Sequence, residues 1–94
     1  MRKINFCVPI VDLENKEVTN GGKKVMINEV IANMLSGSKP RKSAIRQLNL
    51  ALNIFNSKEA IDIEDEDVET IKRVVEEQSA TVLVAGQLLK LLEK

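Results

Sequence analysis

The sequence predicts a small α+β domain, in which a small N-terminal antiparallel β-hairpin or sheet packs on about four α-helices. Two patterns favour this fold class. The first quarter of the 94-residue chain has alternating apolar residues between turn-forming residues, and the remainder has apolar residues at helical spacing. A typical domain has about 100–150 residues and no linker divides this chain, so we expect residues 1–94 to form a single domain.

Residues 3–25 are predicted to form an irregular hairpin or meander. Apolar side chains alternate at its start, at Ile4, Phe6 and Val8. Pro9 cannot donate to a β-ladder, so it places the strand at an edge or ends it. The turn is expected at residues 20–23, Asn-Gly-Gly-Lys, because asparagine and glycine tolerate a positive φ. A short strand near residues 60–63 can join this sheet.

Residues 27–56 are predicted to form two helices. The first has apolar residues at positions i, i+3, i+4, i+7 and i+8, namely Ile27, Val30, Ile31, Met34 and Leu35. Gly37 is expected to end this helix, and Ser38 is expected to cap the second. The apolar residues on one side of the second helix are Ala44, Ile45, Leu48, Ala51, Leu52 and Phe55. Leu50 and Ile54 widen that stripe, so two faces of the helix can be covered.

Residues 62–92 are predicted to form an acidic helix start followed by two helices. The carboxylates between Asp62 and Asp67 suit a helix start, because the helix dipole favours negative charge there. The third helix runs to about Gln78. Its inward residues are expected to be Val68, Ile71, Val74 and Val75. Ser79 is the expected N-cap of the last helix, whose inward residues are expected to be Val82, Ala85, Leu88, Leu89 and Leu92.

The last helix is apolar on more than one side. Leu83, Val84 and Leu91 extend its apolar surface beyond the roughly 100° stripe that one core contact needs. Burying a leucine side chain is worth about 1.5–3 kcal/mol, so a small domain is expected to cover this surplus with a partner. We therefore expect a homo-oligomer, or a complex with another protein, with Leu83 or Leu91 at the contact.

The composition argues against an enzyme. The chain has no His, no Trp and no Tyr, so it lacks the usual general base at neutral pH and the commonest metal ligand. Its serines have no histidine partner, and the sequence has no glycine-rich phosphate loop. The acidic residues 59–69 lack the glycine of a calcium-binding loop, and we interpret them as a solvated helix start. We expect no catalytic residue, no metal and no cofactor.

The charges balance over the whole chain but not within it. Fourteen basic and fourteen acidic side chains give a formal net charge of zero. Residues 1–58 carry ten basic and four acidic side chains, whereas residues 59–94 carry four basic and ten acidic ones. Halves of opposite sign can pair within one fold or between two copies of the chain.

A basic cluster at the start of the second helix is the candidate site for phosphate or nucleic acid. It consists of Lys39, Arg41, Lys42 and Arg46. Phosphate binding would combine these charges with the free N–H groups of a helix start. Residues 27–55 also allow a helix-turn-helix interpretation, with Ser36-Gly37-Ser38 as the turn. The alternatives are ion pairing with the acidic segment and a solvated face.

Cysteine usage and hydropathy indicate a cytoplasmic protein. Cys7 is the single cysteine and lies in an apolar run, so we expect a buried structural thiol rather than a disulfide. No apolar stretch approaches the roughly 18–20 residues that span a bilayer, and we expect no membrane partner. Pro9, Asp12 and Glu14 interrupt the N-terminal apolar residues before they reach the length of a signal peptide.

Three segments of the chain resemble a known group of proteins. They are residues 27–35 (INEVIANML), residues 61–63 (IDI) with the acidic helix start that follows, and residues 84–93 (VAGQLLKLLE). Together with the N-terminal hairpin, this layout resembles small accessory proteins encoded by bacteriophages and prophages. The resemblance implies a phage-derived origin, a location in the host cytoplasm and a non-enzymatic role in assembly or host interaction. The alternative is a nucleic-acid-binding regulator that uses the basic helix start at residues 39–46.

Overall fold

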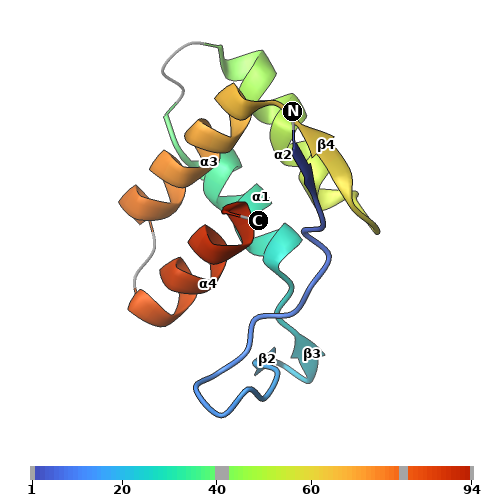
Figure 1. Ribbon diagram of the computed structural model, residues 1–94, viewed down its shortest axis with the longest axis vertical. Helices are drawn as coiled ribbons and strands as arrows, with labels where there is room; N and C mark the ends of the chain where they lie inside the picture. Colours follow the sequence, from blue (N-terminus) through green and yellow to red (C-terminus); the bar gives the residue numbers. More distant parts are fainter. Residues whose placement is uncertain (1, 40–42, 79–80, 94) are drawn as a thin grey trace.

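The computed structural model describes residues 2–39, 43–78 and 81–93, and within them it has four helices and two small antiparallel sheets (Figure 1). The elements are β1 (Arg2–Ile4), β2 (Thr19–Asn20), β3 (Lys23–Lys24), α1 (Ile27–Gly37), α2 (Ala44–Phe55), β4 (Ile61–Ile63), α3 (Asp65–Gln78) and α4 (Val82–Leu92). The predicted α+β class is confirmed. None of the helices in these ranges is long and apolar enough to cross a membrane.

The short strand predicted near residues 60–63 pairs with the N-terminal segment. β1 runs antiparallel to β4, with Arg2 opposite Ile63 and Ile4 opposite Ile61. Ile4 and Ile63 are both buried, so one face of this two-stranded sheet belongs to the core. The pairing also holds the start of α3, which follows β4 directly, beside the N-terminus (Figure 1).

The glycine turn forms a second sheet at the opposite end of the molecule from α2 (Figure 1). β2 and β3 pair with Thr19 opposite Lys24, and the two intervening residues, Gly21 and Gly22, have φ values of 62° and 82°. Positive φ at both central residues is the geometry of a type I′ hairpin turn, which glycine adopts without a steric penalty. The sequence prediction of this turn is therefore confirmed.

The core lies between α1, α2, α3 and α4, with β1, β4 and the segment after β1 closing its edge. α1 packs against α2 and α3, and α3 packs against α4. The largest fully buried side chains are Phe6, Ile31, Leu35, Ile54, Ile71, Leu88, Leu92, Val68, Val74 and Val75. The inward faces predicted for α1 and α3 are confirmed, because helical periodicity alone defines one apolar side on each of them.

Cys7 is half-buried rather than buried as expected. Phe6 is fully buried, and neighbouring residues of an extended chain point to opposite sides. The inward position therefore belongs to Phe6, and the thiol side chain lies toward the surface.

Two helix caps differ from the predicted ones. Ser38 ends α1, its backbone N–H donating to the carbonyl of Leu35, while Gly37 is the last residue of α1 itself. The N-cap of α2 is Ser43, whose hydroxyl accepts a hydrogen bond from the backbone N–H of Arg46 at 3.2 Å. Serine is a good cap at either position, so residue type alone could not choose between them.

The N-cap of α4 is Thr81, whose hydroxyl accepts a hydrogen bond from the backbone N–H of Val84 at 3.3 Å. Ser79, the predicted cap, lies outside the described residues. Threonine at the observed position satisfies one of the free N–H groups of the first helical turn.

The inward side of α4 also differs from the predicted one. Val82, expected in the core, is 90% exposed. Leu88 and Leu92 are buried as predicted, and Val84 and Leu91 pack against the core beside them. The helix is rotated so that Val84 and Leu91 take inward positions, which leaves Val82 outside. Most of the apolar surplus predicted for this helix therefore covers the domain's own core, and Leu83 is half-buried.

Candidate functional site

Helix α2 has two apolar faces, and only one of them packs against the rest of the domain. Its buried residues are Gln47, Leu50, Ala51 and Ile54. Its exposed apolar residues, which we name the α2 outer stripe, are Ile45 at 74% exposure, Leu48 at 51%, Leu52 at 49% and Phe55 at 48%. The predicted one-sided stripe is thus divided, because Leu50 and Ile54, which were expected only to widen it, form the core side.

Two polar side chains hold α2 in this rotation against α1. The amide of Gln47 donates to the backbone carbonyl of Leu35 at 2.9 Å and to the hydroxyl of Ser38 at 2.7 Å. At the other end of the helix pair, the amide of Asn28 donates to the backbone carbonyl of Phe55 at 3.0 Å. Buried amides need such partners, so turning α2 to bury the outer stripe would break both contacts.

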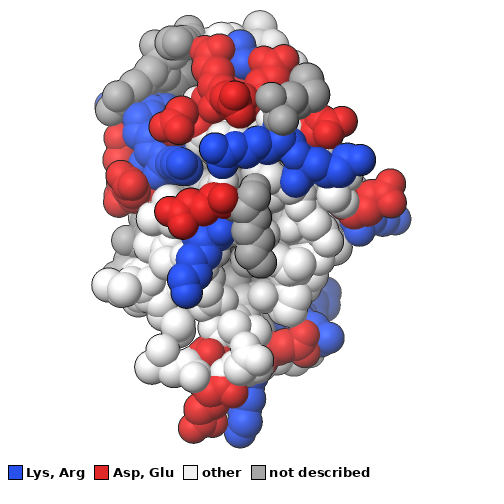
Figure 2. Space-filling model, viewed as in Figure 1, with Lys and Arg blue, Asp and Glu red and all other residues white. Residues whose placement is uncertain are grey.

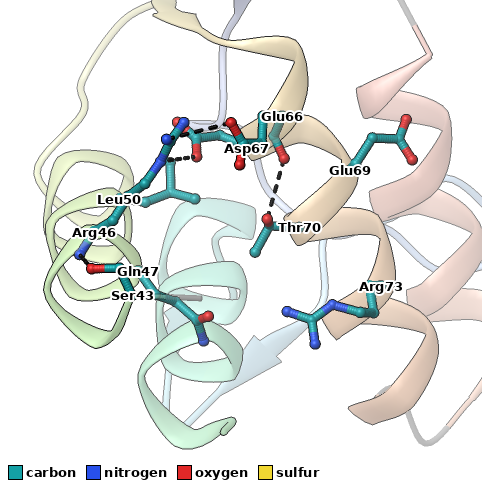
Figure 3. A pocket seen from close by; sticks show the side chains of 9 residues that line it. All are labelled: Ser43, Arg46, Gln47, Leu50, Glu66, Asp67, Glu69, Thr70 and Arg73. Atoms are coloured by element: carbon teal, nitrogen blue, oxygen red, sulfur yellow. Dashed lines mark hydrogen bonds and ion pairs between the residues drawn. The ribbon is translucent and has the colours of Figure 1, made fainter. Parts of the chain in front are cut away.

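Arg46, from the predicted basic cluster, contacts the acidic start of α3 (Figure 3). Its Nε lies 3.2 Å from Asp67 Oδ1, its Nη2 lies 3.2 Å from Glu64 Oε2, and its Nη1 lies 3.4 Å from Glu66 Oε2. The hydrogen bond to Asp67, followed by the negative charges of Asp67 and Glu66, raises the pKa of Arg46. The guanidinium is therefore engaged by carboxylates of its own chain.

The other members of the basic cluster are not brought to Arg46 by any described contact. Lys39 is exposed at the end of the first described range, and Arg41 and Lys42 lie outside the described residues. Around α2 and the start of α3, basic and acidic side chains are interspersed, while the surface over α4 is largely uncharged (Figure 2). The described part of the predicted phosphate site is thus a surface of mixed charge.

The helix-turn-helix interpretation does not fit the connection between α1 and α2. Ser36 and Gly37, two residues of the expected turn, belong to α1. α2 begins only at Ala44, so six residues separate the two helices, whereas the motif uses a turn of about three or four.

A groove of about 360 Å³ lies between α2 and α3 (Figure 3). It is lined by Ser43, Arg46, Gln47, Leu50, Glu66, Asp67, Glu69, Thr70 and Arg73. Its two hydroxyl groups serve helix geometry, since Ser43 caps α2 and Thr70 donates to the backbone carbonyl of Glu66 at 3.2 Å. Among the described residues, no group of three or more acidic, Cys or His side chains is arranged to hold a metal ion.

A second hollow of about 690 Å³ lies on the other side of Arg46, between α2 and the junction of β4 with α3. Ile45, Asn49 and Asn53 line it from α2, and Asp62 and Ile63 line it from β4. Ile45 therefore belongs both to this hollow and to the α2 outer stripe, so the apolar surface continues from the stripe into a concave region.

The α2 outer stripe was missed as a site by sequence reasoning, although one signal was present. Arg46 is the single charged residue between Ala44 and Phe55. A helix with one solvent-facing side normally carries several charged residues there. Exposed neutral asparagines, at positions 49, 53 and 56, take their place.

Comparisons with protein-family models, curated proteins and solved structures found no match to this chain. The resemblance to phage-encoded proteins therefore stays an expectation.

Proposed function

We propose that this chain is a non-enzymatic accessory protein that acts through protein–protein contact or self-assembly, and that the α2 outer stripe is its contact surface. The observation that supports the proposal is the exposure of four large apolar side chains in one row on a helix with a single charged residue. A contiguous exposed apolar patch of this kind is characteristic of interaction sites. A role in a phage or prophage, in the host cytoplasm, is part of the proposal and rests on the resemblance.

The energetics support a contact surface rather than a tolerated defect. Fully burying one large aliphatic side chain is worth about 1.5–3 kcal/mol, and a small domain has a stability of only about 5–15 kcal/mol. Neither Leu48 nor Leu52 contributes its full burial to this domain, because each is about half exposed. Covering both with a partner would recover an appreciable free energy.

Site-specific photo-crosslinking in the cells that make the protein tests this function. A photoreactive residue replaces Leu48 or Leu52, and the matched control replaces Glu76, an exposed polar residue of α3. We expect covalent adducts from positions 48 and 52 and none from position 76. Equal labelling at all three positions, or no adduct from the stripe, would overturn the proposal.

A further inference from the structure

We propose that the partner of the α2 outer stripe is a second copy of this chain, and that the two α2 helices pair antiparallel across a two-fold axis. This inference rests on the proposed function and names the partner of the same surface.

The spacing of the stripe is the same when read in either direction. Ile45 and Leu48 are three residues apart, Leu48 and Leu52 are four apart, and Leu52 and Phe55 are three apart. A two-fold axis at the level of Leu50 therefore places Leu48 opposite Leu52 of the partner subunit, and Ile45 opposite Phe55 of the partner subunit. Alternate spacings of three and four also form the seam of paired helices, and a surface that matches itself is what a two-fold interface requires.

Side-chain size and helix dipoles favour the antiparallel direction. Antiparallel pairing places the largest side chain of the stripe, Phe55, opposite the smaller Ile45 of the partner subunit. Parallel pairing would instead place Phe55 on Phe55 and Ile45 on Ile45. Large residues pack best against small ones, and antiparallel helices align their macrodipoles favourably.

The charge of the surface suits an identical copy. Arg46 is the single charged residue of α2, and three carboxylates of its own chain contact it. Two identical faces therefore meet without like-charge repulsion along the stripe. Asn49 lies one residue from the level of the axis, so the Asn49 amides of the two subunits come to the same side of the helix pair. An amide both donates and accepts hydrogen bonds, and is thus complementary to itself.

The area of the stripe fits an ordinary dimer interface. With about half or more of some 200 Å² exposed on each of four side chains, the stripe offers on the order of 400 Å² of apolar surface. A standard interface buries about 800 Å² per partner, of which a little over half is apolar. The stripe alone thus supplies nearly the whole apolar share of one side.

The solution mass of the purified chain is the first test. We expect light scattering to give twice the chain mass at concentrations above the micromolar level, falling toward one chain mass on dilution by about two orders of magnitude. The Leu48→Lys/Leu52→Lys variant should have one chain mass throughout. The matched control Asn53→Lys adds charge to the same helix outside the stripe and should keep the wild-type mass.

Circular dichroism of each variant shows whether it is folded. Leu52→Ser is a smaller change than the double lysine substitution, and it should weaken the affinity of the dimer at least about tenfold. A wild-type chain of one chain mass at every concentration, or a dimer that survives the double lysine substitution in the folded state, overturns the inference.

Cysteine crosslinking tests the direction of pairing. On a Cys7→Ser background, Leu48→Cys and Leu52→Cys chains are oxidised separately and then as a mixture. Antiparallel pairing predicts a disulfide between one Leu48→Cys chain and one Leu52→Cys chain, and little from either chain alone, because identical positions are offset by about 6 Å along the axes. Disulfides formed by each chain alone would show a parallel pair and overturn this arrangement.

The in-cell crosslinking separates the two proposals. Adducts of twice the chain mass from positions 48 and 52 agree with both. Adducts of another mass, together with a monomeric purified chain, would leave the proposed function standing and overturn the second-copy inference. No adduct at either position would overturn the proposed function itself.

Discussion

Gln87 of α4 binds both backbone groups of Val11. Its Oε1 accepts a hydrogen bond from the Val11 N–H at 2.9 Å, and its Nε2 donates to the Val11 carbonyl at 2.6 Å. The side-chain amide thus takes the place of a neighbouring β-strand for one residue. Seventy-six positions separate the two residues, and the contact ties the irregular segment between β1 and β2 to the last helix.

Replacing Gln87 should destabilise the fold more than replacing a surface glutamine. Gln87→Ala leaves two half-buried backbone groups of Val11 without their partner, and an unsatisfied buried group costs about 1–3 kcal/mol. Gln78→Ala is the control, because Gln78 is exposed and its side-chain amide donates a 3.1 Å hydrogen bond to the Met34 carbonyl. Urea denaturation measures both free energies of unfolding. Equal losses in the two variants would contradict the importance of the Val11 contact.

Replacing Arg46 should lower the midpoint of thermal unfolding modestly. High salt should remove the difference between the variant and the wild-type chain. Arg46→Gln removes a cation from three carboxylates, but exposed ion pairs are screened by salt. The control is Arg73→Gln, at the same groove. Calorimetry at low and high sodium chloride compares them, and a midpoint difference that persists at high salt would show that Arg46 acts through packing.

Unlike high salt, a rise from neutral to mildly alkaline pH should not remove the contribution of Arg46 to stability. The pKa of Arg46 is raised in the folded state by its hydrogen bond to Asp67 and the nearby negative charges. A raised pKa adds stability that is fully present below the unfolded-state pKa of arginine and is lost only in stronger alkali. Between neutral and mildly alkaline pH, the contribution of Arg46 should therefore be constant.

Alanine substitutions on the two faces of α2 should have very different effects on the stability of the monomer. Ile54→Ala removes a fully buried side chain and should cost about 2–5 kcal/mol. Leu52→Ala, on the outer stripe, should cost less than about 1.5 kcal/mol when measured at a concentration where the chain is monomeric. Similar losses at the two positions would mean that the outer stripe is covered within one chain.

Alanine in place of glycine should act in opposite directions at two positions. Gly22→Ala places a side chain at a φ of 82° and should destabilise the hairpin by about 1–2 kcal/mol. Gly86 lies inside α4, and a Cβ there would meet nothing within 4 Å, so Gly86→Ala should stabilise the fold by about 0.5–1 kcal/mol. Guanidinium denaturation of both variants shows whether each substitution raises or lowers the free energy of unfolding. A stabilising Gly22→Ala would refute the turn geometry.

Local pattern was sufficient for most of the secondary structure. The period of the apolar residues identified α1 and α3 together with their buried sides, since each of these helices has one apolar face. The glycine pair at 21–22 marked the turn because its backbone geometry excludes most other residues. The alternating Ile61-Asp62-Ile63 marked β4, and β1 was the extended segment available to pair with it.

Contacts between distant residues decided what the sequence left open on α2 and α4. Both faces of α2 are apolar, so the pattern alone does not say which is buried. The rotation follows from the bonds of Gln47 to Leu35 and of Asn28 to Phe55, which exist only when α1 and α2 are packed together. The rotation of α4 likewise follows from its packing against α3 and from the bond of Gln87 to Val11.

The sequence by itself therefore determined an α+β domain with two apolar faces on its second helix and an acidic start to its third. The tertiary structure alone placed the surplus apolar surface on α2 instead of α4, and joined Arg46 to the carboxylates of α3. The physical reason is that periodicity is a property of one helix, whereas burial and ion pairing depend on which helices meet and how each is turned.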